Sequence, residues 1–385
     1  RHTANNALNF NHYPDKDGYR SHAVSGTLGY RWAEGHRIGL TAYNGYTRGD
    51  YDAGTFTSDA YALHRQQAYS LSSADRITDW WDSDLRFGFT KDGYDDRGYQ
   101  SVVNSLKRHY SWTNTFKPLV DQRMSVLLER QEERVQSTTQ YDRDARNTNA
   151  AALIYKGKFD RLHTQASVRN DDNEQFGNHT TGSLGYGLAL GHGLRLTASA
   201  GTGFKAPTFN DLYFPWSSNP ALKPEESTSV NVGIAQYGEG WNWTFNAYES
   251  RIDQLIALDS TYTPYNIAKA RIRGAELTGF ASLAGFDINA QASFTDPRDH
   301  TRGAASYDNW LPRRARSSGR LDVDRGFGPL RVGVTATATG HRFDNAGNSL
   351  RLAGSGTVDL RVEYAINEAW SLQARAANVF DREYE

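Results

Sequence analysis

Two acidic segments near the start of the chain carry the residues best suited to binding a metal ion. The first is Asp15-Lys16-Asp17-Gly18, and the second holds Asp50, Asp52 and Asp59. Clusters of carboxylate oxygens suit Ca²⁺, which takes about six to eight oxygen ligands in flexible geometry. Asp and Gly are also ordinary turn residues. The residues alone therefore leave two interpretations open, a calcium site and solvated loop charge.

Other reactive groups show no arrangement typical of an enzyme. The eleven histidines are scattered without an H-E-x-x-H pattern, there is no G-x-S-x-G, and there is no cysteine. The glycines of Gly201-Thr202-Gly203 precede no helical pattern, which excludes a phosphate-binding loop. We expect no enzymatic activity. An outer-membrane protease or phospholipase, whose nucleophile and base the fold would assemble, is the remaining enzymatic alternative.

Composition narrows the class of protein that carries these residues. The 43 basic and 44 acidic residues nearly cancel, so we expect no nucleic-acid partner. Mean hydropathy is low, at -0.70, yet aromatic residues reach 12%. Disordered chains are poor in aromatics, whereas a transmembrane β-barrel combines an apolar lipid face, a polar lumen and aromatic girdles. No apolar run is long enough for a membrane-spanning helix, which needs about 18 residues.

Hydrophobic residues recur with the two-residue period of β-strands. Val24, Leu28 and Tyr30 alternate with polar residues, and Trp241 to Ala247 repeats the pattern. About eighteen such segments of roughly 10 to 16 residues follow one another, longer than the 5 to 6 typical of soluble sandwiches. We therefore predict an all-β, antiparallel transmembrane β-barrel. No linker or change of composition divides residues 1–385, so we expect a single domain.

The connections between these segments alternate in length. Short turns are expected at 33–35, 156–158, 191–193, 238–240 and 284–285. Long polar loops are expected at 47–67, 91–101, 136–146, 170–178, 204–227, 251–271, 297–314 and 341–354. Short turns at one rim and long loops at the other are typical of outer-membrane barrels. In one of these loops, we expect Asp92, Asp95 and Asp96 to be solvated.

Four motifs in order resemble those of the TonB-dependent outer-membrane receptors. They are GTGFKAP with DLY (201–213), NPALKPEES (219–227), the segment from Asn266 to Glu276, and ANVFDREY (377–384). The resemblance implies a 22-stranded barrel in the Gram-negative outer membrane, monomeric and surrounded by lipid and lipopolysaccharide. It also implies that the family's N-terminal plug, which engages the TonB complex, and its final strand are absent from this sequence. We therefore expect a partial barrel.

Within that family, several stretches are similar to the receptors for vitamin B12 (cobalamin). They include RNDDNEQFG (169–177) and LPRRA (311–315). The resemblance implies uptake of cobalamin or a related corrinoid, with a substrate-linked Ca²⁺ held by ligands from the two acidic segments. These ligands are Asp15, Asp17, Tyr51 through its carbonyl, Asp52 and Asp59.

The resemblance also places an arginine, Arg313, near the substrate. Arg313 can instead pair with carboxylates of the lumen or rim. The aromatic side chains of Tyr213 and Trp216 can stack on a flat ligand, or pack their own loop. A receptor for siderophores or haem is the alternative within the family. A passive porin-like channel is the alternative of another class, and it would lack the four motifs.

Overall fold

The computed structural model describes residues 17–52, 59–215, 217–259 and 261–384. These residues fall into two compact units, which are taken separately below. The first comprises 1–156, 167–181 and 208–221, and the second comprises 157–166, 182–207 and 222–385. No helix in the described residues is long and apolar enough to span a membrane. The single-domain assignment stays a prediction.

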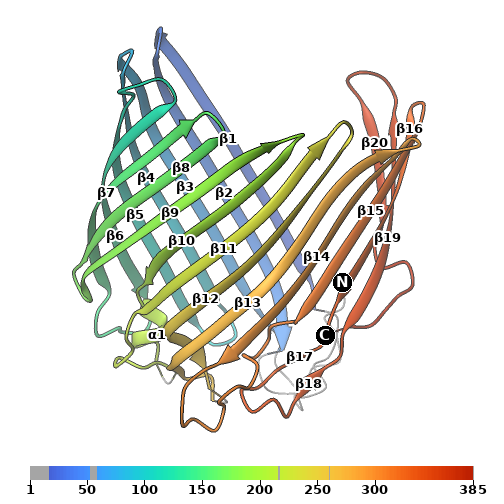
Figure 1. The fold of residues 1–385 in the computed structure, drawn as a ribbon. Helices are drawn as coiled ribbons and strands as arrows, with labels where there is room; N and C mark the ends of the chain where they lie inside the picture. The colour runs from blue at the N-terminus through green and yellow to red at the C-terminus, as the bar shows by residue number, and fades with distance from the viewer. Residues whose placement is uncertain (1–16, 53–58, 216, 260, 385) are drawn as a thin grey trace. The chain divides into compact units, whose positions relative to one another are not determined.

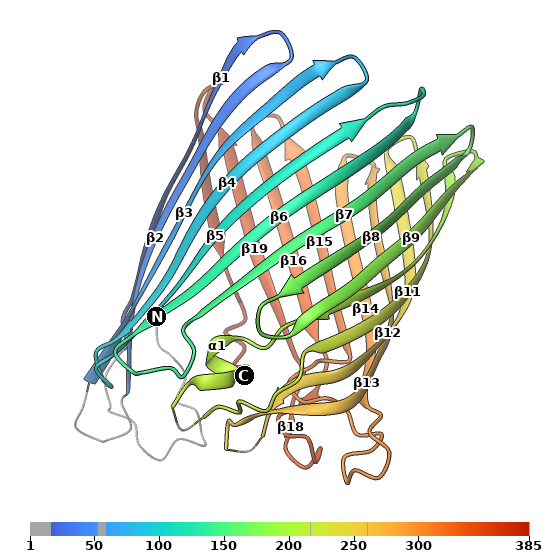
Figure 2. The same ribbon diagram turned by 90° about the vertical axis from the view of Figure 1, so that its left-hand side faces the viewer.

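The first unit is built from long antiparallel strands in chain order, which run side by side in Figure 2. They are β1 (Tyr19–Ala33), β2 (His36–Asp52), β3 (Asp59–Thr78), β4 (Trp81–Asp96), β5 (Ser101–Phe116) and β6 (Gln122–Ser137). It also contains α1 (Phe209–Tyr213). Three strands contribute residues to both units, β7 (Ala145–Phe159), β8 (Leu162–Asn173) and β9 (Gly177–Gly191).

The second unit is also built as an antiparallel ladder, and Figure 1 shows its strands side by side. Its first strands are β10 (Leu194–Lys205), β11 (Glu225–Gly238), β12 (Trp241–Leu258), β13 (Pro264–Leu283) and β14 (Phe286–Asp299). Then follow β15 (Ser317–Phe327), β16 (Leu330–Thr339), β17 (Arg342–Phe343), β18 (Arg351–Leu352), β19 (Ser355–Ala365) and β20 (Ser371–Ala376). Within the described residues, 18 strands share one sheet, and β17 and β18 form a two-stranded one. The predicted all-β class and approximate strand number are confirmed.

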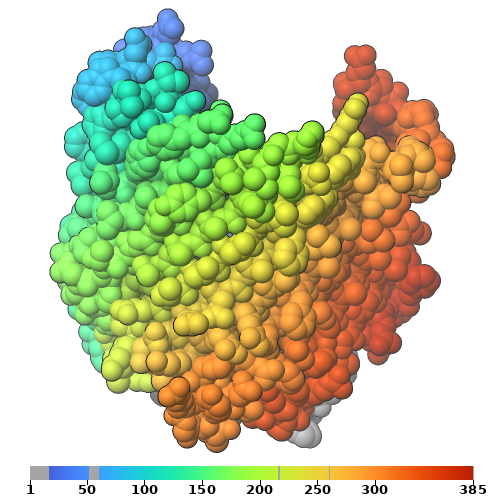
Figure 3. All heavy atoms as spheres, in the orientation of Figure 1, coloured from blue at the N-terminus to red at the C-terminus, as the bar shows by residue number. Residues whose placement is uncertain are grey.

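One face of each sheet segment is apolar and exposed, as the alternation predicts. On β1, the side chains of Val24, Leu28 and Tyr30 are 72%, 70% and 67% exposed. On β12 and β13, Phe245 and Leu277 lie directly opposite each other and are 40% and 49% exposed. In water such a surface would be unfavourable, whereas in a bilayer it is the lipid-facing side. Strands β11 to β14 present a continuous surface in Figure 3.

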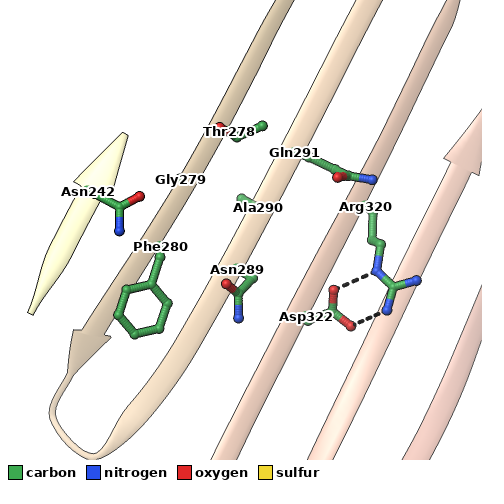
Figure 4. A pocket seen from close by; sticks show the side chains of 9 residues that line it. All are labelled: Asn242, Thr278, Gly279, Phe280, Asn289, Ala290, Gln291, Arg320 and Asp322. Carbon is green, nitrogen blue, oxygen red and sulfur yellow. Dashed lines mark hydrogen bonds and ion pairs between the residues drawn. The ribbon is translucent and has the colours of Figure 1, made fainter. Parts of the chain in front are cut away.

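The opposite face of the second unit is polar. A cavity of about 220 Å³ lies over β12 to β15, lined by Asn242, Asn289, Gln291 and an ion pair (Figure 4). In that pair, Arg320 donates two hydrogen bonds to the carboxylate of Asp322, at 2.6 and 2.8 Å. Such a bidentate pair satisfies both charged groups away from lipid. This face is therefore the lumenal side of the strands.

Several predicted loops are in fact largely strand. Strands β2 and β3 extend to Asp52 and back to Asp59, so most of 47–67 is paired backbone, and 91–101, 136–146, 170–178 and 251–271 are shortened likewise. Beyond the membrane both faces of a strand meet water, so its sequence loses the alternation that marks a half-buried strand. The turn predicted at 156–158 is also wrong, because β7 continues to Phe159 and the chain reverses at Asp160 and Arg161.

The turn after β9, at the short-turn rim, contains two glycines that differ in the space around them. Gly191 and Gly193 both have positive φ, +94° and +72°. A Cβ on Gly193 would collide with the Tyr237 carbonyl of β11, whereas a Cβ on Gly191 meets nothing within 4 Å.

We expect Gly191→Ala to cost about 1–2 kcal/mol of unfolding free energy from backbone strain alone. Gly193→Ala adds the collision with the Tyr237 carbonyl, so it should lower the unfolding free energy further. Urea unfolding of both variants in detergent measures the difference, and equal losses would show that the turn has room to move.

Candidate functional site

The two acidic segments meet where β1 begins and β2 ends. Tyr19 lies opposite Gly49, and the Asp50 amide donates to the Gly18 carbonyl at 2.9 Å. A Cβ on Gly18 would lie 2.5 Å from the Asp50 carboxylate, so a larger residue here would force the Asp50 side chain to move. Arg48 donates to the other oxygen of Asp50 at 2.9 Å. The residue next to Asp17 is thus held against the end of β2.

The Tyr51 side chain is engaged with the neighbouring acidic loop. Its hydroxyl donates to Asp96, whose same oxygen accepts the amides of Gly98 at 3.0 Å and Tyr99 at 3.1 Å. Burial, followed by the hydrogen bond to Asp96, raises the pKa of Tyr51. Asp96 is only 8% exposed, so our expectation that it is solvated is wrong. It is buried because it closes the turn between β4 and β5.

The remaining predicted calcium ligands are only partly described. Asp15 lies outside the described residues. Asp52 and Asp59 occupy opposite positions in the register that joins β2 to β3. Among described residues there is no group of three or more His, Asp or Glu placed to hold a metal ion. The donor chemistry of the converging segments fits a hard cation such as Ca²⁺, and the ligand set stays a prediction.

The 201–213 motif contains the short helix α1. Thr208 caps it, since the Asp211 amide donates to the Thr208 hydroxyl at 3.1 Å and the Thr208 amide donates to the Asp211 carboxylate at 2.9 Å. This reciprocal capping satisfies donors that a helix start leaves free. The same turn buries Phe209 and Leu212, which are 7% and 1% exposed.

The predicted ligand aromatic Tyr213 packs its loop onto the rim of the first unit. With Phe214 it packs against a cluster formed by Val135, Tyr141 and Phe209. Its hydroxyl accepts a hydrogen bond of 2.7 Å from Gln175. These contacts favour the loop-packing alternative for Tyr213, whose ring remains half-buried. Trp216 lies outside the described residues.

Sequence reasoning missed Arg146, which anchors α1. Its guanidinium donates to one Glu133 oxygen at 3.0 and 2.8 Å and lies 4.9 Å from the Phe209 ring centre. The residue is 5% exposed. A buried arginine is stable only when paired, and this one has both an acid and an aromatic face. No pattern in the sequence signals this role, because Arg146 lies in a segment assigned to a loop.

In the second unit, Arg313 lies in the 300–316 connection. Its Nε donates to Asp344 at 2.8 Å and its amide donates to the Phe343 carbonyl at 2.6 Å. The hydrogen bond to Asp344 raises the pKa of Arg313. This matches the carboxylate-pairing alternative, although 60% of the side chain is exposed. The adjacent Arg314 has no hydrogen bond or ion pair among the described residues.

The second and third motifs are joined by Asn266. Its side chain accepts the Lys223 amide at 2.9 Å and donates to the Lys223 carbonyl at 3.0 Å. It also donates to the Gln254 carbonyl at 2.7 Å. One amide group thereby satisfies three main-chain groups where regular pairing ends. These motifs therefore hold the long-loop rim together.

The burial of Asp96 can be tested by truncation. Asp96→Ala leaves the half-buried Tyr51 hydroxyl and the amides of Gly98 and Tyr99 without their acceptor, so we expect a loss of about 2 kcal/mol in unfolding free energy. Asp92, whose side chain is 55% exposed, is the control. Asp92→Ala should change the unfolding free energy by less than about 0.5 kcal/mol. Hydrogen exchange at Gly98 and Tyr99 gives a local readout, and unchanged protection in Asp96→Ala would contradict the assignment.

Comparison with known proteins agrees with this architecture. The family model described as "TonB dependent receptor-like, beta-barrel" matches residues 1–379. A vitamin B12 transporter BtuB of Photobacterium profundum is 30% identical over 96% of the chain, and one of Vibrio vulnificus is 29% identical over 96%. The chain spans 62% of the length of either relative.

Among solved structures, the siderophore receptor PirA of Acinetobacter baumannii has a similar fold. The TM-score is 0.79, over 97% of this chain and 68% of that one, at 15% identity. The family expected from the four motifs is confirmed by the match to its model. The chain belongs to the TonB-dependent receptor-like β-barrel family, an outer-membrane family of Gram-negative bacteria.

Proposed function

We propose that the chain is the barrel part of a receptor that binds and imports cobalamin or a related corrinoid. The observation that carries the proposal is the identity of 30% and 29% to two relatives named as vitamin B12 transporters, over 96% of the chain. The solved siderophore receptor is only 15% identical, so its likeness concerns the fold alone. The siderophore or haem alternative therefore has weaker support, and no catalytic step is involved.

In this proposal the long-loop rim captures the nutrient. Arg313 and Trp216 are the proposed ligand contacts, whereas Tyr213, the other aromatic candidate, packs its own loop. The Arg313 guanidinium is a donor for amide or phosphate oxygens of a corrinoid, and the Trp216 ring is a flat stacking surface. The receptor acts as a monomer. The TonB complex, acting on the plug that accompanies such barrels, supplies the energy that opens the lumen.

Calcium is proposed as the ion that orders the rim. Asp15, Asp17, Asp52 and Asp59 would supply carboxylate oxygens, and Tyr51 a main-chain oxygen. The contact between Gly18 and Asp50 supports this, because it brings the first acidic segment to the end of β2. The bound ion would offset repulsion among these carboxylates and hold the loops in a binding-competent arrangement. Ligand and calcium binding would then strengthen each other.

The proposal is tested by cyanocobalamin binding to the full-length protein with Ca²⁺ and with a calcium chelator. We expect binding to strengthen at least about tenfold with Ca²⁺, equivalent to about 1.4 kcal/mol. The Asp15→Ala/Asp52→Ala double variant should lose this dependence, and Asp92→Ala should keep it. Binding of ferric chelates but not cobalamin would overturn the ligand, while calcium dependence in the double variant equal to wild type would overturn the metal site.

The role of Arg313 has a separate test, because Asp344 competes for its guanidinium. If Arg313 contacts the ligand, Arg313→Ala should weaken cobalamin binding about tenfold, the loss of one charge-assisted hydrogen bond. Asp344→Ala frees the guanidinium and should preserve or strengthen binding. Equal weakening by both substitutions would show that the ion pair only supports the loop.

A further inference from the structure

The outward face of β12, β13 and β14 changes from apolar to charged along a single line across three strands. The last apolar row is Ala247, Ala275 and Phe294, which lie opposite one another in register. On the same face, two residues further toward the long loops, the next row is Glu249, Arg273 and Asp296. Such a line marks the boundary between the hydrocarbon layer and the headgroup region. Figure 1 shows the three strands adjacent to one another.

Directly beyond that boundary lie three arginines in register, here called the arginine row. Arg271 of β13 is opposite Arg251 of β12 on one side and Arg298 of β14 on the other. Residues directly opposite in antiparallel strands have Cβ atoms about 5 Å apart, and like charges there are destabilising. A protein that keeps such a row needs a source of negative charge to offset it.

Among the described residues, acidic side chains pair with the two ends of the row, and Asp308 also lies 3.7 Å from Arg298. Arg251 pairs with Glu249 at 2.8 Å, and Arg298 pairs with Asp296 at 2.7 Å. Asp296 is already shared, since Arg273 also binds it at 3.2 Å. The central Arg271 has no ion pair among the described residues, and its buried Nε has no hydrogen-bond acceptor.

Lys269 adds to the positive potential around Arg271, and the neighbouring, uncharged His300 adds an unfilled hydrogen-bonding group. Lys269 occupies the next outward position on β13, where only the exposed Asp253 lies opposite it. The His300 amide donates to the Lys269 carbonyl at 2.8 Å, and the buried His300 Nε2 has no hydrogen-bond partner in the part of the chain that the structure describes. Burial and then the charge of Arg271 lower the pKa of His300. The surroundings of Arg271 thus contain a second cation and unfilled hydrogen-bonding capacity.

Trp310 holds the end of the row rigid. The guanidinium groups of Arg298 and Arg316 each lie 4.4 Å from the centre of its ring. Its indole donates to Asp296 at 3.1 Å. A tryptophan is suited to the membrane interface, where its ring meets apolar groups and its N–H meets polar ones. The arginines are therefore positioned beside the interface before any ligand arrives.

We propose that the arginine row, with Lys269, binds the phosphate of an anionic lipid headgroup in the outer leaflet. From Phe294 to Arg298 is four residues, about 14 Å along a strand at roughly 3.4 Å per residue. A lipid whose acyl chains cover the apolar rows therefore places its phosphate near the arginines. Guanidinium groups bind phosphate oxygens in a bidentate manner. This site lies outside the lumen and is independent of the nutrient that the receptor imports.

The test uses the full-length protein in neutral detergent, with diphosphoryl lipid A as probe and native mass spectrometry as readout. Dephosphorylated lipid A and inorganic phosphate are the comparison ligands. Arg271→Gln removes the central charge without shortening the side chain greatly. The matched control is Arg123→Gln, which also removes one exposed arginine. Arg123 lies at the short-turn end of β6, the end away from the long loops.

We expect Arg271→Gln to weaken diphosphoryl lipid A binding at least tenfold and Arg123→Gln to leave it unchanged. The dephosphorylated lipid should bind wild type as weakly as diphosphoryl lipid A binds Arg271→Gln. Without lipid, Arg271→Gln should have an equal or higher melting temperature, because it relieves repulsion in the row. Wild-type affinity in Arg271→Gln, or equal binding of the dephosphorylated lipid, overturns the proposal. Inorganic phosphate binding as tightly as the lipid would show an ion site and overturn the lipid assignment.

Discussion

The structure depends on one constraint, that strands in a hydrocarbon layer must satisfy every main-chain hydrogen bond among themselves. The long antiparallel pairings meet it, and the register of β12 with β13 runs unbroken from Trp241 to Asp253. Register fixes which side chains share a face, because a slip by one residue would turn every apolar side chain toward the lumen. The lipid face, the polar lumenal face and the arginine row all follow from that register.

The sequence predicts the fold well where the membrane imposes a contrast between the two faces. The alternation of Val24, Leu28 and Tyr30, and of Trp241 to Ala247, identifies strands correctly. Prediction fails beyond the membrane, where both faces are polar. The extension of β2 to Asp52 and of β12 to Leu258 has no hydrophobic period to reveal it. At 156–158, glycine and lysines resemble a turn but occupy a strand.

The candidate site was harder to predict than the fold. The sequence identifies acidic segments, and pairing of β1 with β2 explains why Gly18 and Asp50 meet. It does not show that Asp96 is buried or that Arg146 pairs with Glu133 beneath α1, because both depend on contacts between distant segments. The motifs that reveal the family have structural roles here. Asp211 caps a helix and Asn266 joins two loops, so their presence indicates the scaffold rather than the ligand.

The central claim is that one strand face meets lipid up to a sharp boundary on β13 between Ala275 and Arg273. The chain has no cysteine, so single-cysteine variants can carry a spin label at each position from 269 to 281 without other changes. Accessibility to oxygen and to a water-soluble nickel chelate, measured in bilayers, tests the claim directly. We predict high oxygen accessibility at 275, 277, 279 and 281 and low values at the intervening positions. At 273, a label should instead be accessible to the nickel chelate. Uniform accessibility along the strand, or the opposite phase, would contradict the assigned register and the membrane boundary.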